Sequence, residues 1–136
     1  MSFVLDSSLS LSWCFDDERT DATDALLERV VEAGAVAPAL WPLEVLNALA
    51  MAERRSRIDA ERRQRLAGFL RDLPVTIDEE TASQAWAVTS QLAARFRLTV
   101  YDAAYLELAQ RRGLPLATLD QELRAAAAAL GVTLLD

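Results

Sequence analysis

Four acidic residues stand at points where one predicted element gives way to the next: Asp6, Glu44, Asp102 and Asp120. If the segments alternate between strand and helix, at least Asp6 and Asp120 fall at the carboxyl ends of parallel strands. That edge is where open α/β sheets bind ligands. Carboxylates that meet at one edge repel one another unless cations lie between them. The four residues therefore predict a site for a hard divalent cation, Mg²⁺ or Mn²⁺.

The remaining composition limits which chemistry can accompany this site. The sequence has no His and no Lys, and all 14 of its cationic side chains are Arg. Catalysis by a His base, a Lys Schiff base or a P-loop lysine is excluded, as is a zinc site that uses imidazole. Cys14 is the only cysteine, so we expect a small buried side chain there and no internal disulfide. The groups that remain for catalysis are carboxylates, Arg, hydroxyls and metal ions.

Length and charge set further bounds. A chain of 136 residues predicts one domain, spanning residues 1–136, with a core large enough to fold without disulfides. The net charge of −7 argues against a protein that coats nucleic acid, but an acidic pocket loaded with cations becomes a phosphate site. Neither a signal peptide nor a membrane span is recognisable, which predicts a cytoplasmic protein without membrane contact.

Short apolar runs alternate with stretches of helical spacing along the chain. The strands are predicted at 2–5, 35–38, 74–77, 116–119 and 132–135, with the third at an edge because Pro74 begins it. The helices are predicted at 7–15, 20–33, 42–55, 59–71, 79–96, 100–112 and 121–130. This alternation predicts the α/β class and a three-layer α/β/α sandwich around a short, mostly parallel sheet.

Each of the four acids also has a purely structural explanation. Asp6 and Asp120 could cap the helices that follow them, Asp102 fits a capping box that begins at Thr99, and Glu44 suits the first turn of its helix. Two features favour a site. Glu44 shares a helix face with Asn47 in an otherwise apolar stretch, 41–52, and Asp102 is the only charge in 100–106.

Four segments together resemble the acidic motifs of PIN-domain ribonucleases, and most closely those of the VapC-type toxins of toxin–antitoxin pairs. The segments read FVLDSS from Phe3, PLEVLNAL from Pro42, YDAAY from Tyr101 and LATLD from Leu116. They occur in the family's order and approximate spacing, and they span essentially the whole chain. The resemblance implies a PIN-like fold, a Mg²⁺ or Mn²⁺ site, endonucleolytic cleavage of RNA, and a homodimer inhibited by a cognate antitoxin.

The resemblance also assigns roles to residues. Asp6, Glu44, Asp102 and Asp120 match the acidic quartet of the family, whose members bind the metal and catalyse cleavage. Ser7 and Thr118 match polar neighbours that support the metal or the substrate. Asn47 matches a position that is often polar.

RNA must also be attracted to an acidic protein, and arginines gather around one predicted turn. Arg54, Arg55 and Arg57 are the candidates for RNA contacts, with Arg62, Arg63 and Arg65 nearby. The alternative, which we favour, is a solvated face partly paired with Glu53 and Glu61. We likewise expect Trp13, Trp41 and Trp86 to pack in the core rather than to stack on bases.

Other functions remain as alternatives. A receiver domain needs a Lys near its last strands, and a phosphatase of the haloacid type needs Asp-x-Asp after its first strand, where this chain has Asp6-Ser7-Ser8. The alternative that is not an enzyme is a catalytically silent PIN-like module that binds RNA or a protein. Such a module would usually have lost some of the four acids.

Overall fold

The computed structural model describes residues 2–136 and contains a four-stranded parallel sheet. The order across the sheet is β3-β2-β1-β4. The strands are short: β1 is Val4–Leu5, β2 is Ala35–Ala37, β3 is Val75–Ile77 and β4 is Leu116–Ala117. β1, β2 and β4 are buried, as expected for parallel strands covered on both faces.

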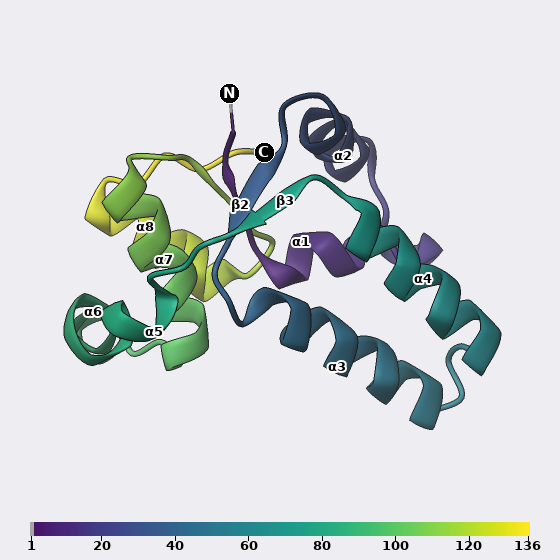
Figure 1. Ribbon diagram of the computed structural model, residues 1–136. Coiled ribbons are helices and arrows are strands. Elements are labelled where there is room, and N and C mark those ends of the chain that lie inside the picture. Colours follow the sequence, from purple (N-terminus) through teal and green to yellow (C-terminus); the bar gives the residue numbers. More distant parts are fainter. Residues whose placement is uncertain (1) are drawn as a thin grey trace.

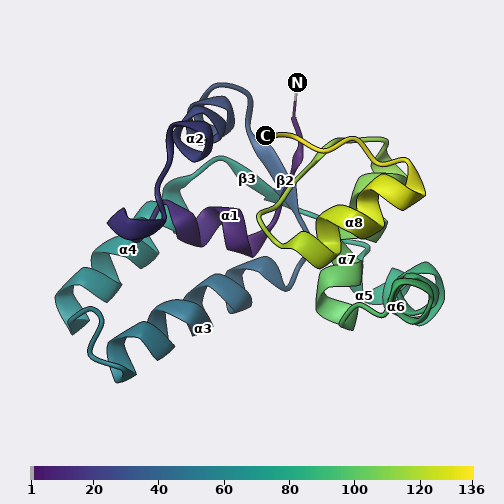
Figure 2. The same ribbon diagram turned by 180° about the vertical axis from the view of Figure 1, so that it is seen from behind.

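Helices cover both faces of this sheet. On one side of the strands lie α1 (Ser7–Ser12), α2 (Asp21–Ala33), α3 (Trp41–Arg54) and α4 (Ala60–Asp72), as Figures 1 and 2 show. On the other side lie α5 (Thr81–Gln84), α6 (Ser90–Phe96), α7 (Val100–Arg112) and α8 (Gln121–Leu130). The predicted three-layer α/β/α architecture is confirmed, and so is the edge position of β3.

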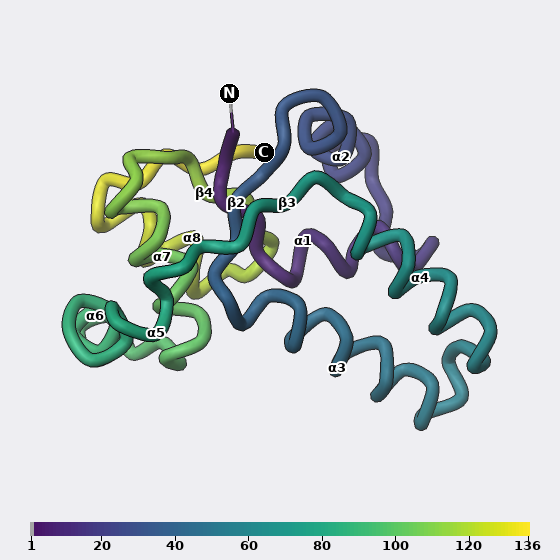
Figure 3. Tube along the Cα trace, viewed as in Figure 1, coloured from purple at the N-terminus to yellow at the C-terminus, as the bar shows by residue number. Residues whose placement is uncertain are grey.

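The strand order reverses beside β1. From β1 the chain moves outward to β2 and β3, and later returns to pair β4 with the other side of β1 (Figure 3). Val4 therefore has two partners, Val36 on β2 and Leu116 on β4. A reversal of this kind opens a crevice at the carboxyl ends of the two strands concerned.

Local sequence signals explain where several elements begin and end. The side chains of Thr20 and Asp59 cap α2 and α4 by accepting the N–H groups of Thr23 and Arg62. Gly34 follows α2 with φ +75°, and a Cβ there would lie 3.1 Å from the carbonyl oxygen of Pro74. A glycine is therefore required both by the backbone conformation and by the close approach of the chain before β3.

The core is centred on the sheet and α7. Every residue from 103 to 109 on α7 is buried, and Tyr105, Leu106 and Leu108 are fully so. Cys14 is buried as predicted, and burial raises the pKa of its thiol to about 11. Within the described residues, none of the helices is both long enough and apolar enough to cross a bilayer.

Three predicted elements differ from those observed. The first helix ends at Ser12 and not at residue 15, and the Trp13 indole beyond it donates to the carbonyl of Thr23. The helix expected at 79–96 begins at Thr81 and contains a π-helical segment, Ala85–Thr89. The strand expected at 132–135 is reduced to an isolated parallel bridge between Leu116 and Leu134.

The π-helical segment also overturns the expectation for one tryptophan. Trp13 and Trp41 are buried, but Trp86 is 92% exposed. A π turn has a wider hydrogen-bond spacing than an α turn, so it changes which residues of the helix face the core. The expectation that Trp86 packs in the core was therefore wrong.

Candidate acidic site

Asp6 lies directly after β1, at the crevice beside β4, and is 2% exposed. Its side chain caps α1 by accepting the N–H of Ser7 at 2.8 Å. Its Oδ2 atom accepts hydrogen bonds of 2.6 Å from the hydroxyl of Thr118 and of 2.6 Å from that of Ser8. Burial nevertheless raises the pKa of Asp6 despite these hydrogen bonds. The carboxyl group is thus fixed in place but costly to ionise.

Ser8 is the contact that sequence reasoning missed. Its hydroxyl donates to Asp6 and accepts the N–H of Leu119 at 3.0 Å, while the hydroxyl of Thr118 accepts the N–H of Asp120 at 3.1 Å. Two hydroxyls therefore connect Asp6 with the loop that carries Asp120. The available signal was the second serine in the Asp6-Ser7-Ser8 run, but only the fold brings the loop after β4 beside it.

Glu44 lies in the first turn of α3 and is held by a residue of α7. The hydroxyl of Tyr105 donates to Glu44 Oε1 at 2.6 Å. Burial raises the pKa of Glu44, the hydrogen bond from Tyr105 lowers it, and the charge of Asp6 raises it again, with an increase as the net result. Tyr105 itself is fully buried, so its hydroxyl cannot exchange this partner for bulk water without a movement of α3 or α7.

Asp102 lies in the first turn of α7, where Thr99 caps the helix by accepting the N–H of Asp102 at 3.1 Å. The pKa of Asp102 is raised to about 6, first by burial and then by the charges of Asp6, Asp120 and Glu44. The Thr99 hydrogen bond lowers the pKa by less. The negative charges of the other three carboxylates therefore all act on Asp102.

Asp120 begins α8 and caps it, accepting the N–H of Leu123 at 2.9 Å. The expected caps at Asp6 and Asp120 are thus present. Of the expected capping box only the Thr99 half is found, since the Asp102 carboxylate accepts no hydrogen bond from the N–H of Thr99. Helix N-termini carry a partial positive charge that offsets part of the repulsion between such carboxylates.

The four carboxylates lie near one another, but their side chains do not surround a common point at which an ion could bind. Among residues 2–136, no three Asp, Glu or Cys side chains are arranged so that they could hold a metal ion. The donor set still fits a hard divalent cation, because it consists of carboxylate oxygens, and burial together with neighbouring negative charge raises the pKa of Glu44 and Asp102. A cation would remove the repulsion that raises the pKa of Asp102.

The remaining candidates lie at various distances from this centre. Ser7 lies beside Asp6, to which its hydroxyl donates at 3.4 Å. Asn47 is exposed, one turn beyond Glu44. The exposed positions of Leu43 and Leu46 show that this stretch of α3 is not buried throughout, so the argument from a polar pair on a buried helix was wrong.

The arginines lie at the far end of α3. Arg54 follows Glu44 by ten residues, which corresponds to about 15 Å along a helix. Arg54 and Arg55 are exposed. Arg57 pairs with Asp17 and Glu18 and lies over the ring of Phe15, and Arg63 pairs with Glu53. The expected pairing with Glu53 is present, but the acids that pair with Arg57 come from the segment between α1 and α2.

A groove of about 450 Å³ between α3, α4 and β3 is lined mainly by apolar side chains, among them Trp41, Val45, Leu70 and Ile77. It contains none of the four acids. Its size does not make it the site of chemistry, because a hard cation and a phosphate both need polar ligands.

A profile of the PIN domain matches residues 3–129 of the sequence. The chain belongs to the PIN-domain family. PIN domains are generally nucleases, and the resemblance seen in the acidic motifs is thereby confirmed at the level of the family. A search among curated proteins found no match.

Two solved structures share the fold of this PIN domain. PAE2754 from Pyrobaculum aerophilum is 23% identical, with a TM-score of 0.68, and the match covers 93% of this chain and 84% of that one. FitAcB from Neisseria gonorrhoeae is 16% identical, with a TM-score of 0.69, and the match covers 100% and 97% of the two chains. At these identities the likeness concerns the fold alone.

Proposed function

We propose that the protein is a metal-dependent endoribonuclease that hydrolyses RNA phosphodiester bonds. The observation that supports this most strongly is the grouping of Asp6, Glu44, Asp102 and Asp120 beside the crevice between β1 and β4. The pKa of Asp102 is raised by burial and then by the charges of the other three. Membership of the PIN-domain family supports the same reaction class.

The four carboxylates would hold Mg²⁺ or Mn²⁺. When bound, the ion supplies positive charge for the phosphate and makes water a stronger acid at neutral pH. Asp6 is the fixed ligand, since three hydrogen bonds orient it. Tyr105 orients Glu44 through a 2.6 Å hydrogen bond. Asp102 and Asp120, at the N-termini of α7 and α8, complete the set after side-chain rearrangement.

The substrate would be attracted by positive charge away from the acids. Arg54 and Arg55 are the exposed candidates at the far end of α3, whereas Arg57 is engaged by Asp17 and Glu18. Each phosphate contact contributes to the salt dependence of binding. Replacing both Arg54 and Arg55 by Gln should reduce the slope of log affinity against log salt, measured for RNA binding to the Asp6→Asn variant. An unchanged slope would remove these arginines from the RNA path.

We further propose that the protein acts as the toxin of a toxin–antitoxin pair, as a homodimer held inactive by a cognate antitoxin. This proposal rests on the resemblance of the four acidic segments to VapC-type toxins. Co-expression with the product of a small neighbouring gene should suppress the growth defect caused by the wild-type chain. Growth that is unaffected by induced expression of the active enzyme would count against the role as a toxin.

The nuclease activity is tested with purified Asp6→Asn and Asp102→Asn, with Glu32→Gln on the exposed face of α2 as the matched control. The wild type and the control should cleave RNA with Mg²⁺ or Mn²⁺ and lose cleavage with a chelator. Both site variants should lose cleavage while their circular dichroism remains that of the wild type. Cleavage by both variants at the wild-type rate would refute the assignment.

One observation favours a second function, a catalytically silent module that binds RNA or a protein. Within residues 2–136 the acids do not form a ready-made metal site. Mn²⁺ binding distinguishes the two functions. A rise in Tm with Mn²⁺ that disappears in Asp6→Asn supports the nuclease, and no rise in the wild type supports the silent module.

A further inference from the structure

A second buried carboxylate lies at the same edge of the sheet as Asp6. Asp78 follows β3 directly, donates its N–H to the carbonyl of Ala37 at 2.8 Å and is 1% exposed. Unlike Asp6, it faces arginines. Two nitrogens of Arg111 donate to its two oxygens at 3.2 and 2.6 Å, and Arg112 donates at 2.9 Å. Burial raises the pKa of Asp78, but these arginines outweigh it and hold the pKa below its usual value.

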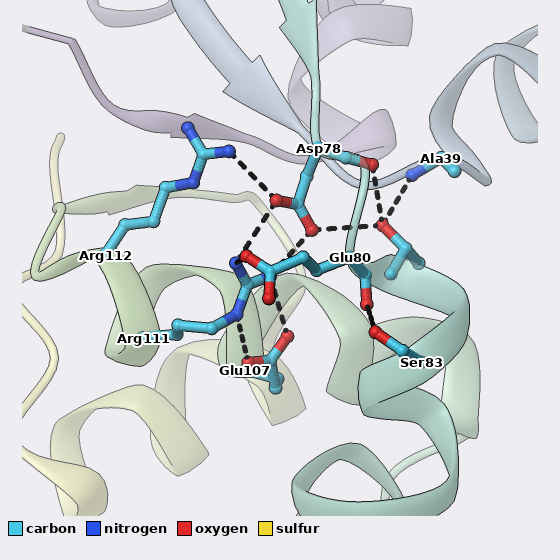
Figure 4. Close-up of polar contacts among 8 residues, drawn as sticks. Ala39, Asp78, Glu80, Ser83, Glu107, Arg111 and Arg112 are labelled. Atoms are coloured by element: carbon cyan, nitrogen blue, oxygen red, sulfur yellow. Dashed lines mark hydrogen bonds and ion pairs between the residues drawn. The ribbon is translucent and has the colours of Figure 1, made fainter.

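Figure 4 shows that Arg111 is shared between several acids. Besides Asp78 it binds Glu107 on its own helix, with Nε at 2.7 Å, and Glu80 at 3.1 Å. Glu107 is buried, so the guanidinium group is held from two sides by carboxylates removed from water. Removing one partner of such a buried ion pair is strongly destabilising, and the geometry of Arg111 is correspondingly fixed.

The same cluster reaches the segment that leads into α3. Thr81, at the start of α5, accepts the N–H of Ala39 at 2.9 Å. Its single hydroxyl proton faces two acceptors of Asp78, Oδ2 and the carbonyl oxygen, each at 3.3 Å. Ala39 lies five residues before Glu44, between β2 and α3. Hydrogen bonds therefore run from Ala39 through Thr81 and Asp78 to Arg111 near the end of α7. Figure 4 labels Ala39, Asp78 and Arg111 in this cluster.

This connection joins the two helices that carry half of the acidic site. α3 bears Glu44, and α7 bears Asp102 and Tyr105. The hydrogen bond from Tyr105 to Glu44 links these helices within the site, and the Asp78 cluster links them outside it. The two links lie at different positions along α7, one at Tyr105 and one at Arg111, and we expect them together to hold the start of α3 in place more firmly than either does alone.

We propose that Asp78, Thr81 and Arg111 form a positioning unit, which holds α3 against α7 so that Glu44 remains bonded to Tyr105 beside Asp6 and Asp102. Asp78 does not act as a metal ligand, because two guanidinium groups occupy its oxygens. The significance for the reaction rests on the proposed function, whereas the effect on the Tyr105–Glu44 contact belongs to the metal-free protein. Asp78, Thr81 and Arg111 are positioning residues and touch no reacting atom.

The test uses a matched pair at Thr81. Thr81→Val removes the hydroxyl at constant shape, whereas Thr81→Ser keeps it. The chain has only two tyrosines, so a Tyr101→Phe background leaves Tyr105 as the single phenol. Its ¹³Cζ chemical shift reports the hydrogen bond to Glu44, and Glu44→Ala in the same background gives the value without that bond. The measurement requires no metal and no RNA.

In Thr81→Val the Tyr105 signal should move measurably toward that of Glu44→Ala, and in Thr81→Ser it should stay at the wild-type position. The Kd for Mn²⁺ should rise about threefold in Thr81→Val, less than the loss of a direct partner of a metal ligand causes. A Tyr105 signal unchanged in Thr81→Val overturns the positioning unit. A wild type that fails to bind Mn²⁺ counts against the nuclease alone, because the Tyr105 signal still decides the inference.

Discussion

Asp102→Asn should make the metal-free protein more stable at neutral pH. Asp102 is repelled by Asp6, Asp120 and Glu44 and is partly removed from water, which together raise its pKa to about 6. Asn has nearly the same shape without the charge. The N–H of residue 102 still reaches Thr99, so the cap of α7 is kept.

The magnitude follows from the pKa. A rise from 3.8 to about 6 corresponds to roughly 3 kcal/mol of unfavourable interaction when the carboxyl group is ionised. The Asp102 side chain is only partly buried, so solvent screening reduces this value. We therefore expect Asp102→Asn to raise the free energy of unfolding by about 1 to 1.5 kcal/mol at pH 7.5.

The sign of the pH dependence is fixed by the direction of the shift. Well below pH 3.8, the ordinary pKa of an Asp carboxyl, Asp102 is protonated in both the folded and the unfolded wild type, so the variant gains nothing. Between pH 4 and 6 the unfolded state loses its proton first, and the wild type loses stability relative to the variant. The gain should therefore grow across this interval and level off above about pH 7.

Urea unfolding, followed by the fluorescence of the buried Trp13 and Trp41, measures this gain at pH 4.0, 5.0, 6.0 and 7.5. Glu32→Gln on the exposed face of α2 is the control and should change stability by less than about 0.5 kcal/mol at every pH. Saturating Mn²⁺ should stabilise the wild type more than Asp102→Asn and so cancel the gain. A variant that is less stable at pH 7.5, or a gain independent of pH, would refute the repulsion on which the proposed site depends.

Three further outcomes are expected. Mn²⁺ at about 100 times its Kd should stabilise the wild type by about 2.7 kcal/mol, which is measured as a rise in Tm. A similar rise in Asp6→Asn would show that the ion binds elsewhere than at the acidic site. Ser8→Ala should weaken Mn²⁺ binding about tenfold in calorimetric titrations, whereas Ser8→Thr should retain it; equal affinities would assign Ser8 a merely local role. Trp86→Ser should leave the free energy of unfolding within about 0.5 kcal/mol of the wild type in urea titrations, and a larger loss would show that this exposed side chain is packed in solution.

The sequence was sufficient to predict the order of elements and most of the caps. Alternation of short apolar runs with helical spacing predicted the α/β sandwich, and Asp6, Thr99 and Asp120 were recognised at helix N-termini, where they are found. These features depend on residues within a few positions of one another. The prediction failed at Trp86, which lies in a π-helical segment that the sequence did not reveal and is exposed.

By itself, the sequence determined which side chains are available to the chemistry: four carboxylates at element boundaries and no His or Lys. Only the tertiary structure decided what each carboxylate meets. Pairing of β1 with β4 brings Thr118 onto Asp6, while packing of α7 against β1, β4 and α5 accompanies the contacts of Arg111 and Arg112 with Asp78. Both acids directly follow a parallel strand, β1 for Asp6 and β3 for Asp78. Burial raises the pKa of both carboxyls, but only Asp78 meets arginines, which hold its pKa below the usual value, whereas the hydroxyls around Asp6 do not offset its burial.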